Sequence, residues 1–516
     1  MEKVLLWLFC LLSLEYGALV GSTRLPNIVL IVTDDQDVVL NGMMPMRNVQ
    51  ELLAKSGATF TNAFTSSPIC CPSRASILSG RYAHNHATTN NSISGGCYGH
   101  FWRDVVEKYT LPVMLHARGY ETFFGGKYLN DYRTTDVPPG WDHWYGLHGN
   151  SIYYNYTLTE NGKSVQYTSE YLTDVLAEKS TQFLEEQRHG KPFFLMVAPP
   201  APHAPATPAP RHEQTFPEVR AARTPNFNHP SGSLDKHWLL TMDPPTLPDD
   251  VLPELDEITR RRWQSLLAVD EMVRGIVESL QKNDLLEETF IVFTSDNGYH
   301  IGQFAQAYDK RQPYETDIRI PLIVRGPGVR KKFLVQQPTL LIDLMPTMLE
   351  WAQMSLPANL DGRSFRGDLV AETPPSISRQ FLIEYWGEVG PNTHSPSCKN
   401  ADKSLYMCTE DAACHCQDAR NNTYACVREL EWKSGEDLRT FLYCEFRDNE
   451  HFVEAYDLLS DPYQMNNVAY EMLPSSRAIY SLVLKNLTNC IGSTCRMYNS
   501  RSYINKINKY QWEYVD

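Results

Sequence analysis

The sequence lacks an excess of positive charge. Its 47 Lys and Arg residues are outnumbered by 61 Asp and Glu residues, so the formal net charge is −14 at pH 7. Binding to nucleic acid or to an anionic membrane surface depends on a summed positive field. The composition therefore argues against both kinds of partner, although an anionic substrate could still bind where cations are concentrated locally.

The mature sequence also lacks a hydrophobic run of the ~20 residues that a membrane span needs. One short apolar run, 4–14, follows Lys3 and precedes a stretch of small residues. This pattern is typical of a signal peptide, which we assign to residues 1–22. We therefore expect a soluble chain in the secretory pathway. Four Asn-X-Ser/Thr sites are candidate glycosylation sites there, at Asn90, Asn155, Asn421 and Asn486.

No internal repeat is visible, and 516 residues that are 42% hydrophobic are enough for a sizeable core. Over 25–375, short apolar runs alternate with segments of helical periodicity, which predicts an α/β layered fold. Helices are expected at 168–187 and 258–281. Strands are expected at 28–32, 122–124, 193–197, 290–293 and 322–324.

The proline-rich stretch 199–230 can form neither a helix nor a central strand, so we expect a long loop there, and such loops are usually functional. After residue 375 the sequence becomes polar and rich in cysteine, with strands expected at 441–445 and 452–456. We therefore assign residues 23–375 to a large α/β domain. Residues 376–516 are assigned to a smaller α+β domain.

Of 12 cysteines, one leaves with the signal peptide and most of the others crowd the last quarter of the chain. In an oxidising pathway this density predicts disulfides. A zinc site formed by the close set Cys408, Cys414, Cys416 and Cys426 is an alternative, but the spacing matches no standard ligand pair. Cys70, Cys71 and Cys97 lie apart, and the sequence leaves the state of Cys71 open.

Polar side chains follow two of the expected strands. Asp34 and Asp35 follow 28–32 after one threonine, and Asp296 and Asn297 follow 290–293 after Thr294-Ser295. Ligands of α/β sheets bind at the carboxyl ends of strands, and an all-oxygen set suits Ca²⁺ or Mg²⁺, with mixed carboxylate and amide oxygens favouring Ca²⁺. The alternative is that these residues form turns or helix caps, and we assign Asp37 to such a supporting role.

The segment 70–80 has the features of a short helix. Pro72 fits its first position and Gly80 its terminator, which places Cys70 at the N-terminus. The partial positive charge there is expected to lower the pKa of the thiol and to favour a bound anion. Alternatively, Cys70 and Cys71 form a redox pair or are two ordinary disulfide partners.

The same segment, Cys70-x-Pro72-Ser73-Arg74-x-x-x-Leu78-x-Gly80, resembles the signature of the sulfatase family, whose first cysteine is converted to formylglycine. The resemblance implies an alkaline-phosphatase-like sandwich, with a large mixed sheet flanked by helices. The polar groups that match the family in order along the chain are Asp34-Asp35, Gly126-Lys127, Pro202-His203, Asp296-Asn297-Gly298 and Lys310.

The resemblance also implies roles for these residues. A Ca²⁺ ion would be held by Asp34, Asp35, Asp296 and Asn297 together with residue 70 in its formylglycine form. The catalytic set would be Cys70, Arg74, Lys127, His203 and Lys310. Many arylsulfatases have a histidine where this chain has Leu129, so the resemblance does not decide which of Lys127, His203 and Lys310 handles the proton.

The implied chemistry starts from the aldehyde at residue 70, which hydrates to a geminal diol. One hydroxyl attacks sulfur and gives a sulfo-enzyme while the alcohol leaves. The second hydroxyl then expels sulfate and restores the aldehyde, a step that a serine could not perform. The maturation partner implied is the formylglycine-generating enzyme.

Finer segments, at 126–130, 223–228, 235–238 and 421–428, resemble family members that remove 6-O-sulfate from N-acetylglucosamine 6-sulfate in heparan and keratan sulfate. This resemblance implies a sulfated glycosaminoglycan substrate and residence in the lysosome, with part of the protein secreted. The resemblance does not decide whether the protein forms a homodimer. The alternatives are arylsulfatase activity, endo-acting glucosaminyl 6-sulfatase activity, or a non-catalytic secreted glycan-binding protein. Endo-acting relatives carry a long basic insert that this chain lacks.

Overall fold

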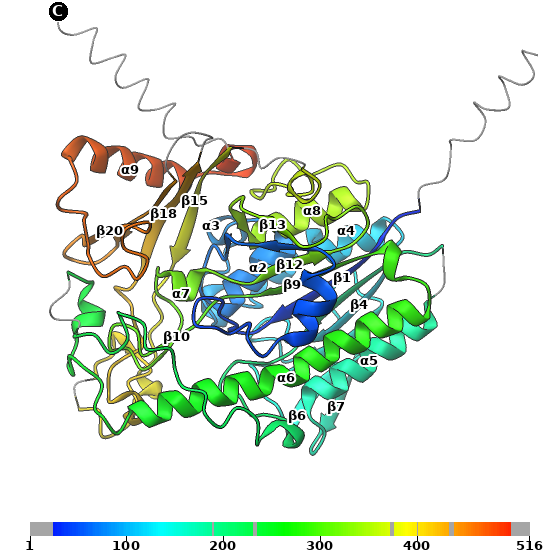
Figure 1. The fold of residues 1–516 in the computed structure, drawn as a ribbon, viewed down its shortest axis with the longest axis horizontal. Helices are drawn as coiled ribbons and strands as arrows, with labels where there is room; N and C mark the ends of the chain where they lie inside the picture. Colours follow the sequence, from blue (N-terminus) through cyan, green and yellow to red (C-terminus); the bar gives the residue numbers. More distant parts are fainter. Residues whose placement is uncertain are drawn as a thin grey trace, which may run out of the picture.

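The computed structural model describes residues 24–187, 190–230, 235–371, 376–399, 401–432 and 438–496. The assigned signal peptide and the assigned domain junction at 375 lie outside these ranges. A ten-stranded sheet forms the centre, with the strand order β13-β2-β12-β9-β1-β8-β4-β5-β6-β7 (Figure 1). Its strands are β1 Asn27–Thr33, β2 Ala58–Phe60, β4 Glu121–Gly126, β5 His143–Leu147, β6 Tyr156–Glu160, β7 Lys163–Tyr167, β8 Phe193–Ala198, β9 Thr289–Ser295, β12 Leu322–Arg325 and β13 Phe333–Val335.

The sheet is mixed, as expected. The neighbours β9, β1, β8, β4 and β5 run parallel, whereas β6, β7 and β12 pair antiparallel with their neighbours. Parallel central strands end at the same edge, so the residues that follow them meet there. Three two-stranded pairs lie outside this sheet: β3 Ala63–Phe64 with β14 Thr339–Leu340, β10 His300–Ile301 with β11 Tyr308–Asp309, and β16 Leu405–Tyr406 with β17 Asp418–Ala419.

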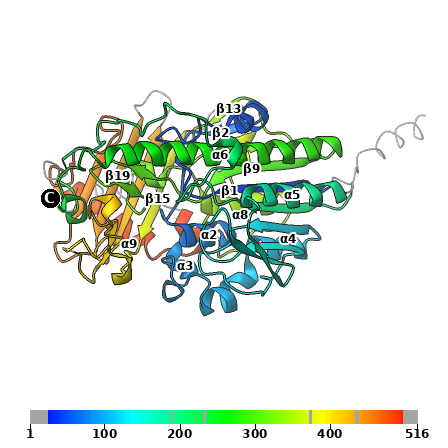
Figure 2. The same cartoon turned by 90° about the horizontal axis from the view of Figure 1, so that it is seen from below.

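Helices cover both faces of the large sheet (Figure 2). Ile28, Leu30 and Val32 of β1 pack in one core with α2, α4 and α8, while Val29 and Ile31 pack in a second core with α5 and α6. A strand covered on both faces is apolar throughout, which explains its uninterrupted hydrophobic run. The helices are α2 Cys70–Ser79, α3 Ala83–His86, α4 Leu111–Ala117, α5 Leu172–Glu186, α6 Leu252–Lys282, α7 Glu315–Ile318, α8 Leu344–Trp351 and α9 Pro474–Leu487.

The five strands expected in the large domain are confirmed, but two helix boundaries are wrong. Helix α5 begins at Leu172 rather than 168, because Tyr171 has extended backbone angles. Helix α6 begins at Leu252, well before 258, with a proline in its first turn, where the missing N–H costs nothing. The stretch 199–230 contains no α-helix and no strand of the sheets, as expected.

A second sheet with the order β15-β18-β19-β20 is antiparallel throughout and is flanked by α9 (Figure 1). Its strands are β15 Ile377–Tyr385, β18 Tyr424–Trp432, β19 Arg439–Phe446 and β20 Val453–Asp457. The expected strands at 441–445 and 452–456 are confirmed. This sheet shares a core with Phe64, Ile69 and Tyr82 of the large domain, so the second sheet packs beside the start of α2.

The prediction that the cysteines form disulfides is confirmed, because the described residues contain five such bonds. The zinc alternative is wrong, because all four of its candidate ligands form bridges. Among the described residues, Cys70 is the one free cysteine, and it is buried. None of the described helices is long and apolar enough to span a bilayer. The bridges are Cys71–Cys97, Cys398–Cys414, Cys408–Cys416, Cys426–Cys444 and Cys490–Cys495.

Candidate active site

Three carboxylates meet where β1 and β9 end. These strands are parallel neighbours whose last residues lie opposite each other, so Asp34 and Asp35 lie beside Asp296. The backbone N–H of Asp35 donates to Asp296 Oδ1 over 3.0 Å. Each of the three carboxylates offers an oxygen within 4.8 Å of the others. All three side chains are buried.

The residues at this point fit a hard divalent cation. Asn297 follows Asp296, and its Oδ1 atom is buried without a hydrogen-bond partner among the described residues. A buried acceptor left unpaired is costly, and a cation would satisfy it. An amide oxygen beside three carboxylates is the kind of oxygen set that Ca²⁺ or Mg²⁺ prefers.

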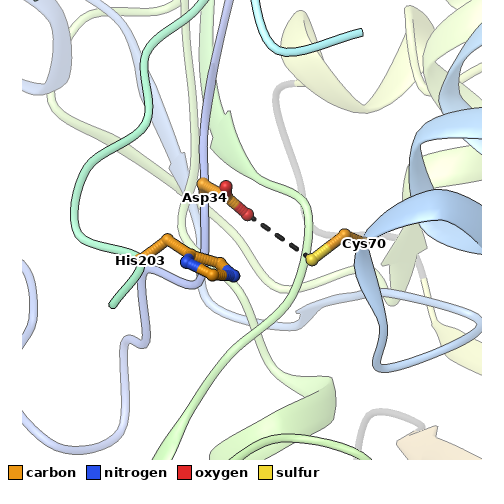
Figure 3. A group of neighbouring side chains, drawn as sticks. All are labelled: Asp34, Cys70 and His203. Atoms are coloured by element: carbon orange, nitrogen blue, oxygen red, sulfur yellow. Dashed lines mark hydrogen bonds between the residues drawn. The ribbon is translucent and has the colours of Figure 1, made fainter. Parts of the chain in front are cut away.

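Cys70 is the first residue of α2, which ends at Gly80 with a left-handed φ of 64°. Pro72 is therefore the third helical residue rather than the first. The Cys70 Sγ atom points at Asp34 Oδ1 from 3.6 Å, and His203 lies beside both (Figure 3). The alternative of a redox pair is wrong, because Cys71 is bonded to Cys97.

The expected lowering of the thiol pKa is also wrong. Burial raises the pKa of Cys70 to about 12, because the loss of solvation outweighs the nearby cations Lys127 and Lys310. The unmodified cysteine is therefore a neutral thiol, and it is a poor nucleophile as it stands.

Three buried cations face the three carboxylates, and each carboxylate has a cation within 2.8 Å, while Arg74 also lies 3.5 Å from Asp34. Equal numbers of opposite charges nearly cancel, so an added divalent cation would leave the site positive and suited to a sulfate ester. The pairs are Arg74 Nε with Asp296 Oδ2 at 2.8 Å, Lys127 Nζ with Asp34 Oδ2 at 2.7 Å, and Lys310 Nζ with Asp35 Oδ2 at 2.7 Å.

The carboxylates are not equally stabilised in their charged forms. Burial acts to raise the pKa of Asp34, but Lys127 and His203 outweigh it and hold this pKa well below its usual value. Burial raises the pKa of Asp296 to about 7, since Arg74 offsets it only in part.

Lys127 is fixed by the end of β4. Its backbone N–H donates to the carbonyl of Ala198 on β8 over 2.9 Å. The preceding Gly126 has a φ of 111°, and a Cβ atom there would lie 2.0 Å from the Ala198 oxygen. Only glycine fits this approach, so the sequence Gly-Lys sets the direction in which the lysine leaves the strand.

His203 lies on the proline-rich loop, at the edge of the cluster. Its Nδ1 atom is 2.7 Å from the carbonyl oxygen of Ala204, and its Nε2 atom is 3.8 Å from Asp35 Oδ2. Burial and the neighbouring Lys310 lower the pKa of the imidazole. Leu129, which replaces the second histidine of many arylsulfatases, lies in the apolar core and takes no part in this cluster.

Comparison with known proteins agrees with this geometry. Residues 26–354 match the family profile described as Sulfatase. The chain belongs to the sulfatase family. Two N-acetylglucosamine-6-sulfatases, from Capra hircus and Homo sapiens, are 44% and 43% identical to this sulfatase. The alignments cover 93% of this chain and 86% and 87% of those proteins.

A solved structure of a protein in complex with its substrate, D-glucosamine-2-N,6-O-disulfate, has the same fold. Its TM-score is 0.69 at 23% identity, and the match covers 90% of this chain and 97% of that chain. The expected sulfatase sandwich with a smaller disulfide-rich sheet domain is therefore confirmed.

Two residues of the sulfatase site were not foreseen from the sequence. Ser151, in the loop after β5, donates its hydroxyl hydrogen to Asp34. Arg262 of α6 donates to the carbonyl of Asp35 over 2.7 Å and pairs with Asp37 at 3.0 Å. A serine after a strand and an arginine in an amphipathic helix are common in any sequence, so neither residue gave a signal of a functional site. Asp37 also accepts two backbone N–H groups of its own turn, which confirms its supporting role.

Other polar residues stay outside the cluster. His300, which lies three residues after Asn297, places its Nδ1 atom 3.0 Å from Asp317 and makes no hydrogen bond to the cluster among the described residues. Of the candidate glycosylation sites, Asn155 is exposed. The half-buried ones are Asn90, Asn421 and Asn486.

Proposed function

We propose that this sulfatase hydrolyses the 6-O-sulfate ester of N-acetylglucosamine 6-sulfate units in heparan and keratan sulfate. The observation that carries the proposal is the buried cluster around Cys70, in which three carboxylates and three cations surround one free thiol. Support for the substrate comes from the N-acetylglucosamine-6-sulfatases that align along 93% of the chain. A complete cluster also favours an enzyme over a non-catalytic glycan-binding protein.

Two groups would complete the site. Oxidation of Cys70 to formylglycine, by the formylglycine-generating enzyme, would supply a hydrated aldehyde as nucleophile. Ca²⁺ held by Asp34, Asp35, residue 70, Asp296 and Asn297 would supply a Lewis acid for the reacting oxygens.

The remaining side chains bind and orient the ester. Arg74, Lys127 and Lys310 are buried cations that would hold the sulfate oxygens. His203 Nε2 has no hydrogen bond to the carboxylates, whereas the Nζ atoms of both lysines lie 2.7 Å from one. We therefore assign the proton donor for the departing sugar oxygen to the imidazolium form of His203, in which Nδ1–H donates to the carbonyl of Ala204 and the lowered pKa makes Nε2–H a stronger acid.

Replacement of His203 by alanine tests this assignment through the leaving group. A sugar alkoxide needs a proton to leave, so His203→Ala is expected to lower kcat on N-acetylglucosamine 6-sulfate by about 10²-fold or more. An aryl sulfate with an acidic phenol needs no proton, and its kcat is expected to fall far less. His229→Ala, on the same loop, is the control. An equal loss on both esters would contradict the assignment.

Substrate preference is tested by sulfate release from three esters. We expect the chain to desulfate N-acetylglucosamine 6-sulfate at a non-reducing end at least ~10-fold better, in kcat/KM, than an aryl sulfate, because a sugar pocket adds binding energy in the transition state. An internal disulfated unit of heparin is the third ester. Preference for that unit would show endo action and overturn the proposed substrate position.

We also propose the domain division, the localisation and the glycosylation of this sulfatase. The division into a catalytic domain, 23–375, and a C-terminal domain, 376–516, is supported by the start of β15 at Ile377. Lysosomal residence by way of the secretory pathway, with part of the protein secreted, is supported by the disulfides and by the kind of substrate. The four candidate sites carry the N-glycans in this proposal.

A further inference from the structure

A polar cavity of about 500 Å³ lies between the loop 89–94 and the chain that leaves β15 at 386–389. It is separate from the buried cluster, and none of the catalytic or metal-binding candidates lines it. Its walls come from both parts of the chain, since residues of the second sheet domain face the loop that follows α3.

One wall of the cavity contacts the first turn of α2, which begins with Cys70. Asn91, which lines the cavity, accepts a hydrogen bond from the backbone N–H of Cys71 over 2.9 Å. Cys71 directly follows Cys70 in α2. The cavity wall is therefore one residue away from the group that would attack the ester.

Another wall of the cavity is linked to the residue that follows Lys310. Glu388 lines the cavity, accepts from the backbone N–H of Asn91 over 2.8 Å, and pairs with Arg311. Arg311 directly follows Lys310. Both walls therefore contact residues adjacent to groups of the buried cluster, Cys70 and Lys310, which favours this cavity for the part of the substrate that lies beyond the sulfate.

Two side chains that line the cavity, Trp386 and Arg420, make few interactions within the described ranges and are free to bind a ligand. Trp386 is half-buried and its indole stacks on no ring among the described residues. Arg420 is exposed, and within the described ranges its guanidinium has no ion pair or hydrogen bond. The face of an indole packs against the apolar C–H surface of a sugar ring, and a guanidinium binds a carboxylate or a sulfate. Together they fit a sugar that carries an anionic group.

We propose that this cavity is the sugar subsite, in which Trp386 packs against the pyranose ring that bears the ester and Arg420 binds a second anionic group of the substrate. The inference rests on the proposed function and adds a preference to it. The second anion is either an N-sulfate on the same ring or the carboxylate of the adjoining uronic acid. Arg420 then makes the enzyme favour substrates with two anionic groups.

Three substrates distinguish the two possible positions of the second anion. N-acetylglucosamine 6-sulfate has no second anion, glucosamine 2-N,6-O-disulfate carries it on the same ring, and a disaccharide with a uronic acid carries it on the next sugar. Arg420→Ala is expected to raise KM about 10-fold for one or both of the dianionic substrates, with KM unchanged for the first. Arg274→Ala, an exposed arginine of α6, is the control.

Trp386→Ala is expected to raise KM about 10-fold for all three substrates, because each places a ring in the cavity, and Trp386→Phe should restore most of the affinity. An Arg420→Ala effect that is absent, or equal on all three substrates, overturns the subsite. If a glycan on Asn90 filled the cavity instead, Asn90→Gln would raise kcat/KM while Trp386→Ala changed nothing, and this result also overturns it.

Failure of the proposed function is distinguishable from failure of the subsite. Calorimetric binding of each substrate to the Cys70→Ala chain, which has no nucleophile, with and without Arg420→Ala, does not depend on turnover. Weaker binding of dianionic sugars without Arg420 would support the subsite even if the unsubstituted enzyme released no sulfate. Sulfate release that is normal in both cavity variants would leave the function intact and refute the subsite.

Discussion

Replacement of Cys70 by serine is expected to abolish catalytic turnover, with a loss of about 10³-fold or more in steady-state sulfate release. A serine has one hydroxyl, so an attack on sulfur would leave a sulfate ester that nothing on the same side chain can expel. The hydrated aldehyde has a second hydroxyl for this step. Release is therefore expected to stop at no more than one equivalent of product alcohol per chain, measured in a single-turnover assay.

The serine variant should still fold and be secreted. Cys70 forms no disulfide and its side chain is buried, so the change removes no covalent link and alters the volume little. The mass of the tryptic peptide that contains residue 70 provides the matched measurement on the unsubstituted protein. Full retention of cysteine there, in protein from a competent secretory host, would contradict the mechanism, as would steady turnover by Cys70→Ser.

The parts of the site that the sequence predicts are those determined by strand ends. Asp34 and Asp296 each follow a fully buried strand with an apolar centre, and two such strands in a parallel sheet finish at the same edge. No comparable rule locates His203, which lies on an irregular loop. Its role came only from the family resemblance.

What the sequence does not predict depends on tertiary contacts. The thiol of Cys70 was expected to be acidic because its helix position is visible in the sequence, whereas its desolvation is not. Strand β18 was missed because it buries charged residues. Its Arg428, for example, pairs with Glu315 at 3.0 Å. Buried charges paired across the fold erase the alternation on which strand prediction depends.

Replacement of Asp296 is expected to remove both activity and calcium binding. Its Oδ1 atom accepts the backbone N–H groups of Asp35 and Asn297, and its Oδ2 atom accepts from Arg74. Asp296→Ala leaves the two backbone donors unpaired and removes the nearest carboxylate from the buried Arg74 guanidinium, at a cost of about 3–5 kcal/mol in the free energy of unfolding. Added Ca²⁺ should not restore activity. Asp296→Asn keeps the size of the side chain and isolates the effect of the lost charge.

The decisive measurement for the Asp296 variants is stabilisation by the ion. A ligand that binds only the folded chain raises its stability by about 2.7 kcal/mol at 100 times its Kd, so the thermal midpoint of the unsubstituted protein should rise with Ca²⁺ and fall with a chelator. Asp343→Asn is the control, because this buried carboxylate also pairs with an arginine, Arg379, and accepts two backbone N–H groups, but contacts no residue of the cluster among the described residues. It should lower the midpoint yet keep the calcium response, whereas Asp296→Asn should lose that response. An undiminished response in Asp296→Asn would refute the calcium site, because Asp296, one of the three carboxylates that meet there, would then not be a ligand.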